Sequence, residues 1–187
     1  MKFQAQDKLE NKLTILTKDK IGVLGGTFDP AHAGHIKISK EAKKRFNLKK
    51  VIWAITKKNP FKNKTSLNLK QRIKFAKKIN FKNKFIEVIF FEDKIKSNRT
   101  INLINYLKKK RKYKKIYFIM GADNLINFHK WYKWEQISSK CNILVFDRNK
   151  YKAKSLKSIA FKKYNKKGLK FINFKKINIS SSQLRKI

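Results

Sequence analysis

Six short apolar runs, separated by stretches of helical pattern, constrain the fold of this sequence more than any other feature. They are IGVLGG at 21–26, VIWAI at 51–55, FIEVIFF at 85–91, IYFIM at 116–120, NILVF at 142–146 and KFINF at 170–174. Short continuous apolar runs are typical of strands that are buried on both faces. Because strands that alternate with helices favour a covered parallel sheet, we expect an α/β fold: a Rossmann-like, doubly wound, mostly parallel sheet with helices on both faces.

The segments between these runs carry helix signals. HIKISKEAKKRF at 35–46 has helical character, and the apolar residues from Leu69 to Ile79 have amphipathic spacing, with Ser66 placed to cap that helix. The same pattern recurs from Ile101 to Leu107, and 155–164 predicts a further helix. No repeat or linker interrupts the series, so we expect a single domain over 21–187.

The composition is typical of a folded domain. The chain has 187 residues, of which 41% are apolar and 13% aromatic, enough for one domain with a core. It has no apolar stretch of the roughly 18 residues that a transmembrane helix needs. Residues 1–20 lack an apolar signal-peptide core, so we interpret them as a polar lead-in. The single cysteine, Cys141, excludes an internal disulfide, fits a reducing cytoplasm and is expected to be buried as a small apolar residue.

The strongest compositional bias is charge, with 50 lysines and arginines against 11 acids and a formal net charge of +39. Clustered cations bind nucleic-acid phosphates by releasing counterions, so nucleic-acid binding is one interpretation. Lysines nevertheless occur along nearly the whole chain, and no zinc-finger spacing, basic-zipper heptad or RNA-recognition motif accompanies them. We therefore expect no specific nucleic-acid partner, but a field that attracts anionic small molecules such as nucleotides.

GGTFDPAHAGH at 25–35 follows the first run directly and concentrates scarce residue types. It holds three of the six glycines and two of the three histidines. It is neither a GxGxxG fingerprint nor a Walker loop. Its glycines still allow the backbone to turn and approach a phosphate, and the following helix offers its positive N-terminus to an anion. His32 and His35 are three residues apart, so both can face one point and donate hydrogen bonds to phosphoryl oxygens. The alternative is a structural turn whose histidines only cap the helix.

Ligands of parallel sheets bind beyond the carboxyl ends of the strands, so the residues after the other runs are further candidates. After the second run, Asn59 shapes a loop and Lys62 could reach an anion or simply be solvated. After the third run, Thr100 lies at a helix start, where it could bind a carboxylate or only cap the helix. After the fifth run, Arg148 could bind an anionic group or remain an exposed charge.

The fourth run is followed by an acid and two tryptophans. Asp123 comes directly after the strand and suits a ribose hydroxyl or a neighbouring donor. Trp131 and Trp134 are three residues apart, which suits either a helical core stripe or stacking on a flat heterocycle. We assign Trp134 to the core and Trp131 to ligand stacking.

INISSSQLR at 177–185 is the last candidate segment. Ser180 and Ser181 offer hydroxyls and amides to a phosphate, although helix capping alone would explain them. Arg185 lies one helical turn further and can contact phosphate oxygens in a bidentate manner. Together with the loop at 25–35, this segment predicts a clamp on a polyphosphate.

These segments resemble the motifs of the nucleotidylyltransferase superfamily. GGTFDPAHAGH is similar to the (H/T)xGH motif, with His32, Gly34 and His35 at its defined positions. ISSSQLR is similar to ISSTxxR, with Arg185 matching and Ser182 in place of threonine. Residues 121–137 resemble the GxDxxxxFxxWxxWxxI segment of bacterial nicotinate-nucleotide adenylyltransferases, and NPFK and SNRT resemble the substrate loops of that subfamily.

The resemblance implies that AMP passes from ATP to nicotinate mononucleotide, giving nicotinate adenine dinucleotide and pyrophosphate on the route to NAD. The mononucleotide phosphate would attack the α-phosphorus directly, with Mg²⁺ bound to the phosphate oxygens of ATP. The residues that it assigns to catalysis are His32, His35 and Arg185. Those that it assigns to ATP binding are Gly25, Gly26, Thr27, Phe28, Gly34, Ser180 and Ser181. Those that it assigns to mononucleotide binding are Asn59, Lys62, Thr100, Asp123, Trp131 and Arg148.

Three alternatives stay open at this point. Pantetheine-phosphate adenylyltransferases share both phosphate motifs but usually have threonine at the position of His32 and lack the segment at 121–137. Nicotinamide mononucleotide differs from the nicotinate substrate only by an amide in place of a carboxylate. A basic nucleic-acid-binding protein that kept the fold would retain its function in a His35→Ala variant. We expect a cytoplasmic enzyme without a membrane partner, and the sequence leaves homo-oligomerisation open.

Overall fold

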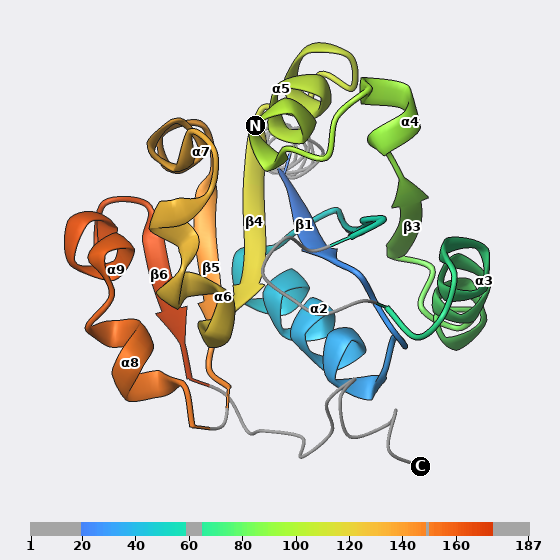
Figure 1. The fold of residues 1–187 in the computed structure, drawn as a ribbon, viewed down its shortest axis with the longest axis horizontal. Coiled ribbons are helices and arrows are strands. Elements are labelled where there is room, and N and C mark those ends of the chain that lie inside the picture. The colour runs from blue at the N-terminus through green and yellow to red at the C-terminus, as the bar shows by residue number, and fades with distance from the viewer. Residues whose placement is uncertain (1–19, 59–64, 149, 174–187) are drawn as a thin grey trace, which may run out of the picture.

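The computed structural model describes residues 20–58, 65–148 and 150–173. Within these ranges the strands form one parallel sheet in the order β3-β2-β1-β4-β5-β6 (Figure 1). The strands are β1 (Lys20–Gly26), β2 (Lys50–Ile55), β3 (Ile86–Phe90), β4 (Lys115–Gly121), β5 (Asn142–Phe146) and β6 (Leu169–Ile172). Every neighbouring pair is parallel, which confirms the predicted fold class.

Helices cover both faces of this sheet (Figure 1). They are α2 (Ala33–Phe46), α3 (Leu69–Ile79), α4 (Glu92–Ile95), α5 (Thr100–Lys109), α6 (Ala122–Ile126), the 3₁₀ turn η1 (Phe128–Lys130), α7 (Trp134–Lys140), α8 (Lys152–Leu156) and α9 (Ile159–Tyr164). Residues of α2 and α3 pack into one buried cluster with one set of strand side chains. Residues of α5, α6, α7 and α9 pack into a second cluster with the other set.

The alternation of side chains along β1 explains how one strand serves both clusters. Ile21 and Val23 belong to the cluster under α5, whereas Leu24 points to the opposite face and belongs to the cluster under α2. Each such aliphatic side chain contributes about 1.5–3 kcal/mol when fully buried. The continuous apolar runs of the sequence are therefore explained by burial on both faces, as predicted.

Two helix predictions need correction. The cap of α3 is Asn68 and not Ser66: Asn68 Oδ1 accepts the Gln71 N–H at 2.9 Å, and the Asn68 N–H donates to Gln71 Oε1 at 3.0 Å. This reciprocal pair satisfies two N-terminal amide groups at once. The helix predicted over 155–164 is divided into α8 and α9, because the Ser158 hydroxyl caps a new helix by accepting the Phe161 N–H at 3.3 Å.

The single cysteine is buried, as the sequence predicts. Cys141 is buried, and its thiol donates a hydrogen bond to the Ile137 carbonyl. Burial raises the pKa of the Cys141 thiol to about 12, so it stays protonated and behaves as a small core residue. In the described ranges, none of the helices combines the length and apolarity required to cross a bilayer.

Candidate active site

Two histidines begin the helix that follows β1. His32 is the N-cap of α2, and its Nδ1 accepts the Gly34 N–H at 3.1 Å. His35 lies three residues on, and its Nδ1 accepts the His32 N–H at 3.2 Å. The ring centroids are 3.9 Å apart. The two imidazoles therefore lie side by side at a helix N-terminus, as their spacing predicts.

The backbone contacts of these rings determine which nitrogen carries the proton. A neutral imidazole has one donor and one acceptor nitrogen, and in both rings Nδ1 acts as the acceptor. We infer that Nε2 carries the hydrogen in the neutral form of both His32 and His35. Each ring then has an N–H group that can donate to an anion beside the positive end of the α2 dipole.

The His32 ring is kept neutral by its surroundings. Burial and, to a smaller extent, the positive charge of Arg148 together lower the pKa of His32 to about 4. Arg148 follows β5, and its Nη1 donates to Asp123 Oδ2 at 2.6 Å. Asp123 lies in the first turn of α6, which follows β4. Because β1, β4 and β5 are neighbours in the sheet, their carboxyl ends bring these three side chains to one place.

The position of Asp123 depends on a glycine that sequence reasoning did not single out. A Cβ atom on Gly121 would lie 2.5 Å from Asp123 Oδ1 and 3.9 Å from Arg148 Cδ. Any larger residue would push the carboxylate away from its ion pair. The signal was present in the sequence, because a glycine that ends an apolar strand often marks a close approach of other groups.

Buried aromatic rings pack against the histidine pair. Phe28 is 2% exposed and stacks on Trp53 with ring centroids 4.8 Å apart. The His35 ring lies 4.8 Å from Phe28, and Trp53 Nε1 donates to the hydroxyl of Ser39, which donates to the His35 carbonyl. Since the Phe28 ring belongs to the core, any contact with ATP would come from its backbone.

The chain turns between β1 and α2 at a different residue from the one predicted. We expected Gly25 and Gly26 to make the turn, but both belong to β1. The residue in the left-handed region is Phe28, with φ of 50°. A bulky residue adopts this conformation at a cost of about 1–3 kcal/mol, and the packing of its ring on Trp53 offsets that cost.

A buried arginine ties this loop to the loop after β2. Arg72, in α3, is 1% exposed, and its guanidinium donates to the carbonyls of Thr27 at 2.6 Å and Thr56 at 2.8 Å. It also donates to the carbonyls of Lys57 at 3.0 Å and Leu67 at 3.1 Å. Burial lowers the pKa of Arg72, and the carboxylates of Asp29 and Glu92 oppose that shift.

A buried aspartate makes a second link between the same loops. The Asp29 carboxylate accepts the Ser66 N–H at 2.8 Å and the Leu67 N–H at 2.9 Å. The loops that follow β1 and β2 are thereby held together at the carboxyl ends of two neighbouring strands. Sequence reasoning missed both Asp29 and Arg72, because an Asp-Pro pair and a helical arginine are usually read as surface features.

The sequence of this chain is similar to those of known proteins. Residues 23–187 match the family described as cytidylyltransferase-like. A protein of Pelagibacter ubique (strain HTCC1062) named "Probable nicotinate-nucleotide adenylyltransferase" is 68% identical over 180 residues, which are 96% of this chain and 99% of that protein. A protein of the same name from Aliarcobacter butzleri (strain RM4018) is 38% identical over 139 residues, 74% of this chain and 76% of that protein.

The chain belongs to the nicotinate-nucleotide adenylyltransferase family.

The fold agrees with this membership. Plasmodium falciparum nicotinic acid mononucleotide adenylyltransferase complexed with NaAD is similar with a TM-score of 0.68 at 19% identity, over 90% of this chain and 83% of that chain. The same enzyme complexed with APC gives a TM-score of 0.69 at 18% identity and the same coverage. These likenesses confirm the doubly wound parallel sheet.

Two of the residues predicted for the mononucleotide, Thr100 and Trp131, come from segments that lie close together. Thr100 is the first residue of α5, and the preceding residue, Arg99, lies 5.2 Å from the ring of Tyr132. Tyr132 adjoins Trp131, so the helix start and the tryptophan segment lie close together. The cap position of α5 is Arg99, so capping does not account for Thr100.

The two tryptophans of the family segment are both partly buried. The Trp131 ring is nearly perpendicular to those of Phe118 and Phe128, at 6.0 and 5.4 Å between ring centroids. Trp134 packs edge-on against Phe128 and Tyr164, at 5.9 and 5.5 Å. Both tryptophans pack against the core, as predicted for Trp134. The stacking role of Trp131 stays a prediction.

Five predicted site residues fall outside the described residues: Asn59, Lys62, Ser180, Ser181 and Arg185. Their places relative to the histidine pair stay predictions. Within the described ranges, no group of three or more His, Cys, Asp or Glu side chains is arranged to hold a metal ion.

Proposed function

We propose that this chain transfers AMP from ATP to nicotinate mononucleotide, releasing pyrophosphate and forming nicotinate adenine dinucleotide. The observation that carries the proposal is the pair of imidazoles at the start of α2, with ring centroids 3.9 Å apart and Arg148 close enough to influence His32. This arrangement suits a chain of phosphates, and family membership specifies the reaction. The same membership supports the cytoplasmic location and the single domain over 21–187, which remain proposals.

The described residues supply charge stabilisation rather than a covalent intermediate. The mononucleotide phosphate oxygen forms a bond to the α-phosphorus while the bond from that phosphorus to the pyrophosphate oxygen breaks. His32 and His35 donate from Nε2 to phosphoryl oxygens on which negative charge grows. The first turn of α2 adds its positive dipole. Gly25, Gly26, Thr27 and Gly34 place the backbone close to the phosphates in this proposal, and Ser180, Ser181 and Arg185 complete the clamp.

The mononucleotide lies, in this proposal, toward β4, β5 and the start of α5. Trp131 offers one face to the pyridine ring, and its perpendicular packing against Phe118 and Phe128 fixes the ring plane. Asp123 and Arg148 contribute the polar contacts, and Thr100 binds the carboxylate of the substrate. Asn59 and Lys62 belong to the same side.

Mg²⁺ enters as part of the ATP complex. The described carboxylates near the histidine pair are engaged elsewhere, Asp29 by backbone amides and Asp123 by Arg148. Magnesium usually keeps several waters and binds substrate phosphates in such sites. We therefore propose that ATP oxygens and water hold the ion, where it neutralises part of the phosphate charge.

The test is pyrophosphate release with MgATP and, separately, nicotinate mononucleotide, nicotinamide mononucleotide and phosphopantetheine. We expect release mainly with the nicotinate substrate. Release only with one of the other two would replace the proposed substrate, and no release with any of them would overturn the activity.

His35→Ala should lower kcat about 10²–10³-fold, because its hydrogen bond strengthens in the transition state. Lys40→Ala is the matched control, since Lys40 is an exposed residue of the same helix. Equal rates for the two variants would remove His35 from catalysis.

A further inference from the structure

A run of basic residues joins α5 to β4 and has no role in the proposed site. Of the eight residues from 108 to 115, seven are lysine or arginine, and the eighth is Tyr113. The negative end of the α5 dipole accounts for Lys108 and Lys109, which lie in its last turn. It does not account for the five basic residues that follow the helix, since the dipole effect falls off within one turn.

The fold brings lysines from distant parts of the sequence next to this run. Lys115 begins β4 and lies in register with Lys20, the first residue of β1. Lys49 precedes β2, and its N–H donates to the Lys20 carbonyl at 2.9 Å. Lysines that look dispersed along the chain therefore form a row across three neighbouring strands. We name Lys20, Lys49 and the run at 108–115 the lysine edge.

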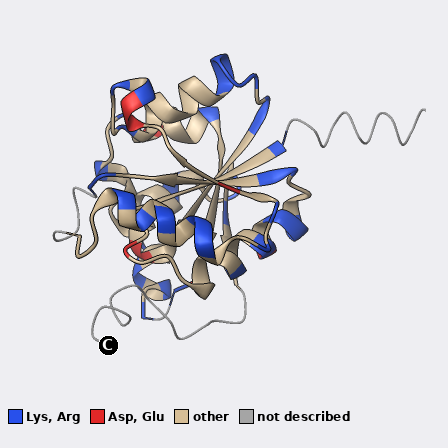
Figure 2. Ribbon diagram, turned by 90° about the vertical axis from the view of Figure 1, so that its right-hand side faces the viewer, with Lys and Arg blue, Asp and Glu red and all other residues tan. Residues whose placement is uncertain are grey.

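Few acidic residues of the described ranges lie near the lysine edge. The sequence from 94 to 122 contains no aspartate or glutamate. Among the described residues, Glu87 forms an ion pair near this edge, with Lys50. Figure 2 shows the same imbalance, with blue segments on many strand ends and helices and red segments on few. Lys20 and Lys115 lie in register on neighbouring strands, so an external polyanion would reduce the repulsion between their charges.

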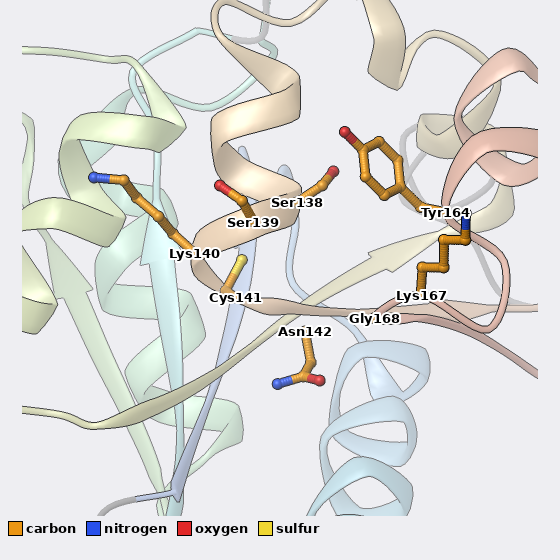
Figure 3. Close-up of a pocket in the computed structure, with 8 residues that line it drawn as sticks. All are labelled: Ser138, Ser139, Lys140, Cys141, Asn142, Tyr164, Lys167 and Gly168. Carbon is orange, nitrogen blue, oxygen red and sulfur yellow. The ribbon is translucent and has the colours of Figure 1, made fainter.

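The positive edge continues onto the next strand. A hollow of about 340 Å³ lies at the amino end of β5, between α7 and the start of β6 (Figure 3). Ser138, Ser139, Tyr164 and Lys167 contribute to its lining. Lys140 also borders it, but its ammonium group donates to Asn105 Oδ1 at 2.8 Å and points away from Tyr164 and Lys167 (Figure 3). Because β5 is the neighbour of β4 in the sheet, this polar hollow adjoins the lysine edge.

We propose that the lysine edge binds the phosphate backbone of nucleic acid, without sequence selectivity, as a second function of the chain. Lysine ammonium groups and arginine guanidinium groups bind the phosphates of the nucleic-acid backbone, and this binding releases counterions from the nucleic acid. The surface lies at the amino ends of the strands, whereas the histidine pair lies beyond the carboxyl ends. The seven residues of β4 separate the two by about 20 Å, so both can be occupied at once.

The chemistry of the edge favours nucleic acid over an anionic membrane. Stable binding to a membrane surface usually combines a basic patch with an inserted apolar face or a lipid chain. The strongly exposed large apolar residues of the described ranges are Phe75, Phe81, Tyr132, Tyr151 and Ile159, and none belongs to the lysine edge. Its aromatic residue, Tyr113, is only partly exposed and lies under the Lys50 ammonium group, 5.6 Å from it.

The test is fluorescence anisotropy of the full chain with a labelled duplex of mixed sequence at several salt concentrations. If about six phosphates are neutralised, log Kd should rise with log salt at a slope of about 5.4, weakening binding about 2,000-fold between roughly 50 and 200 mM salt. The edge variant carries Lys109→Gln, Lys110→Gln, Arg111→Gln and Lys112→Gln. It should lower that slope by about 3.6, because four phosphate contacts are lost.

The matched control removes the same charge from another helix. It carries glutamine at four exposed lysines of α3: Lys70, Lys74, Lys77 and Lys78. We expect its slope to stay near that of the unmodified chain, and both variants to keep full adenylyl-transfer activity. Equal loss of binding in the two variants would show that total charge, and not the lysine edge, holds the duplex.

Two further arms complete the test. The variant with Lys49→Gln and Lys115→Gln alters only strand-end residues and should lower the slope by about 1.8. Binding to phosphatidylglycerol vesicles without binding to the duplex would overturn the proposal in favour of a membrane. Absence of duplex binding at the lowest salt would also overturn it, and neither result bears on the adenylyl-transfer reaction.

Discussion

Replacement of Arg72 by methionine tests how strongly the loops at the carboxyl ends of β1 and β2 depend on one buried guanidinium. Methionine keeps an unbranched apolar stem but has no donor. Four backbone carbonyls then lose a hydrogen bond, those of Thr27, Thr56, Lys57 and Leu67. The nearby Asp29 carboxylate also loses its opposite charge.

The magnitude follows from these contacts. A hydrogen bond to a charged group contributes about 1.5–3 kcal/mol, but four bonds to one guanidinium are not additive. Removing one partner of a buried charged network costs about 3–5 kcal/mol. We therefore expect the free energy of unfolding to fall by about 4 kcal/mol, against a typical total of about 5–15 kcal/mol. For a chain of this size the corresponding fall in Tm is roughly 10 °C.

Urea denaturation followed by circular dichroism measures the change, with Arg45→Met as the control. Arg45 makes an ion pair with Glu41 on the surface of α2, and its side chain is 44% exposed. Its loss should cost about 0–1 kcal/mol. The KM for ATP should also rise in the Arg72 variant, because the loop before His32 loses its anchor. If Arg72→Met cost no more than Arg45→Met, the guanidinium would not hold the loops together.

Three further predictions address the site itself. Gly121→Ala should lower kcat at least about tenfold with a change in stability below about 1.5 kcal/mol, because the new Cβ displaces the Asp123 carboxylate; steady-state kinetics with unchanged rates would contradict this. Trp131→Ala should raise the KM for the mononucleotide about tenfold and leave that for ATP unchanged, since base–aromatic stacking contributes about 1–3 kcal/mol; a shift in the ATP value alone would argue against stacking. The third prediction concerns pH. The pKa of His32 is about 4 in the folded chain, against an ordinary value of 6.5. As pH falls from 6.5 towards 4, the unfolded chain takes up a proton before the folded chain does, so the free energy of unfolding decreases. His32→Asn, which keeps an N-cap side chain, should make the free energy of unfolding less sensitive to pH over that window, and an unchanged pH profile in urea denaturation would refute the neutral buried ring.

The sequence predicts those parts of the molecule that depend on neighbouring residues. The strands follow from continuous apolar runs, and the adjacency of His32 and His35 follows from a spacing of three at a helix start. The roles of Arg72 and Asp29 could not be read in the same way. Arg72 bonds to the carbonyl of Thr27, 45 residues earlier, and only the folded sheet brings those positions together.

Local competition explains the remaining differences. Asn68 replaces Ser66 as the cap of α3 because Gln71 is placed to return its hydrogen bond. Ser158 divides a stretch whose apolar spacing alone favours one helix. Phe28 adopts the left-handed conformation that is expected of a glycine, because its ring is fixed between Trp53 and His35. In each case a specific side-chain contact outweighs the average preference of the residue type.

The hydrogen bonds that start α2 are the same ones that orient its histidines. When the first turn of this helix frays, the Gly34 and His32 amides leave the Nδ1 atoms, and both rings become free to rotate or change tautomer. Amide exchange at these two positions should therefore track the fraction of molecules whose imidazoles point away from the phosphates. A substitution that loosens the helix end would lower turnover even though it touches no substrate atom.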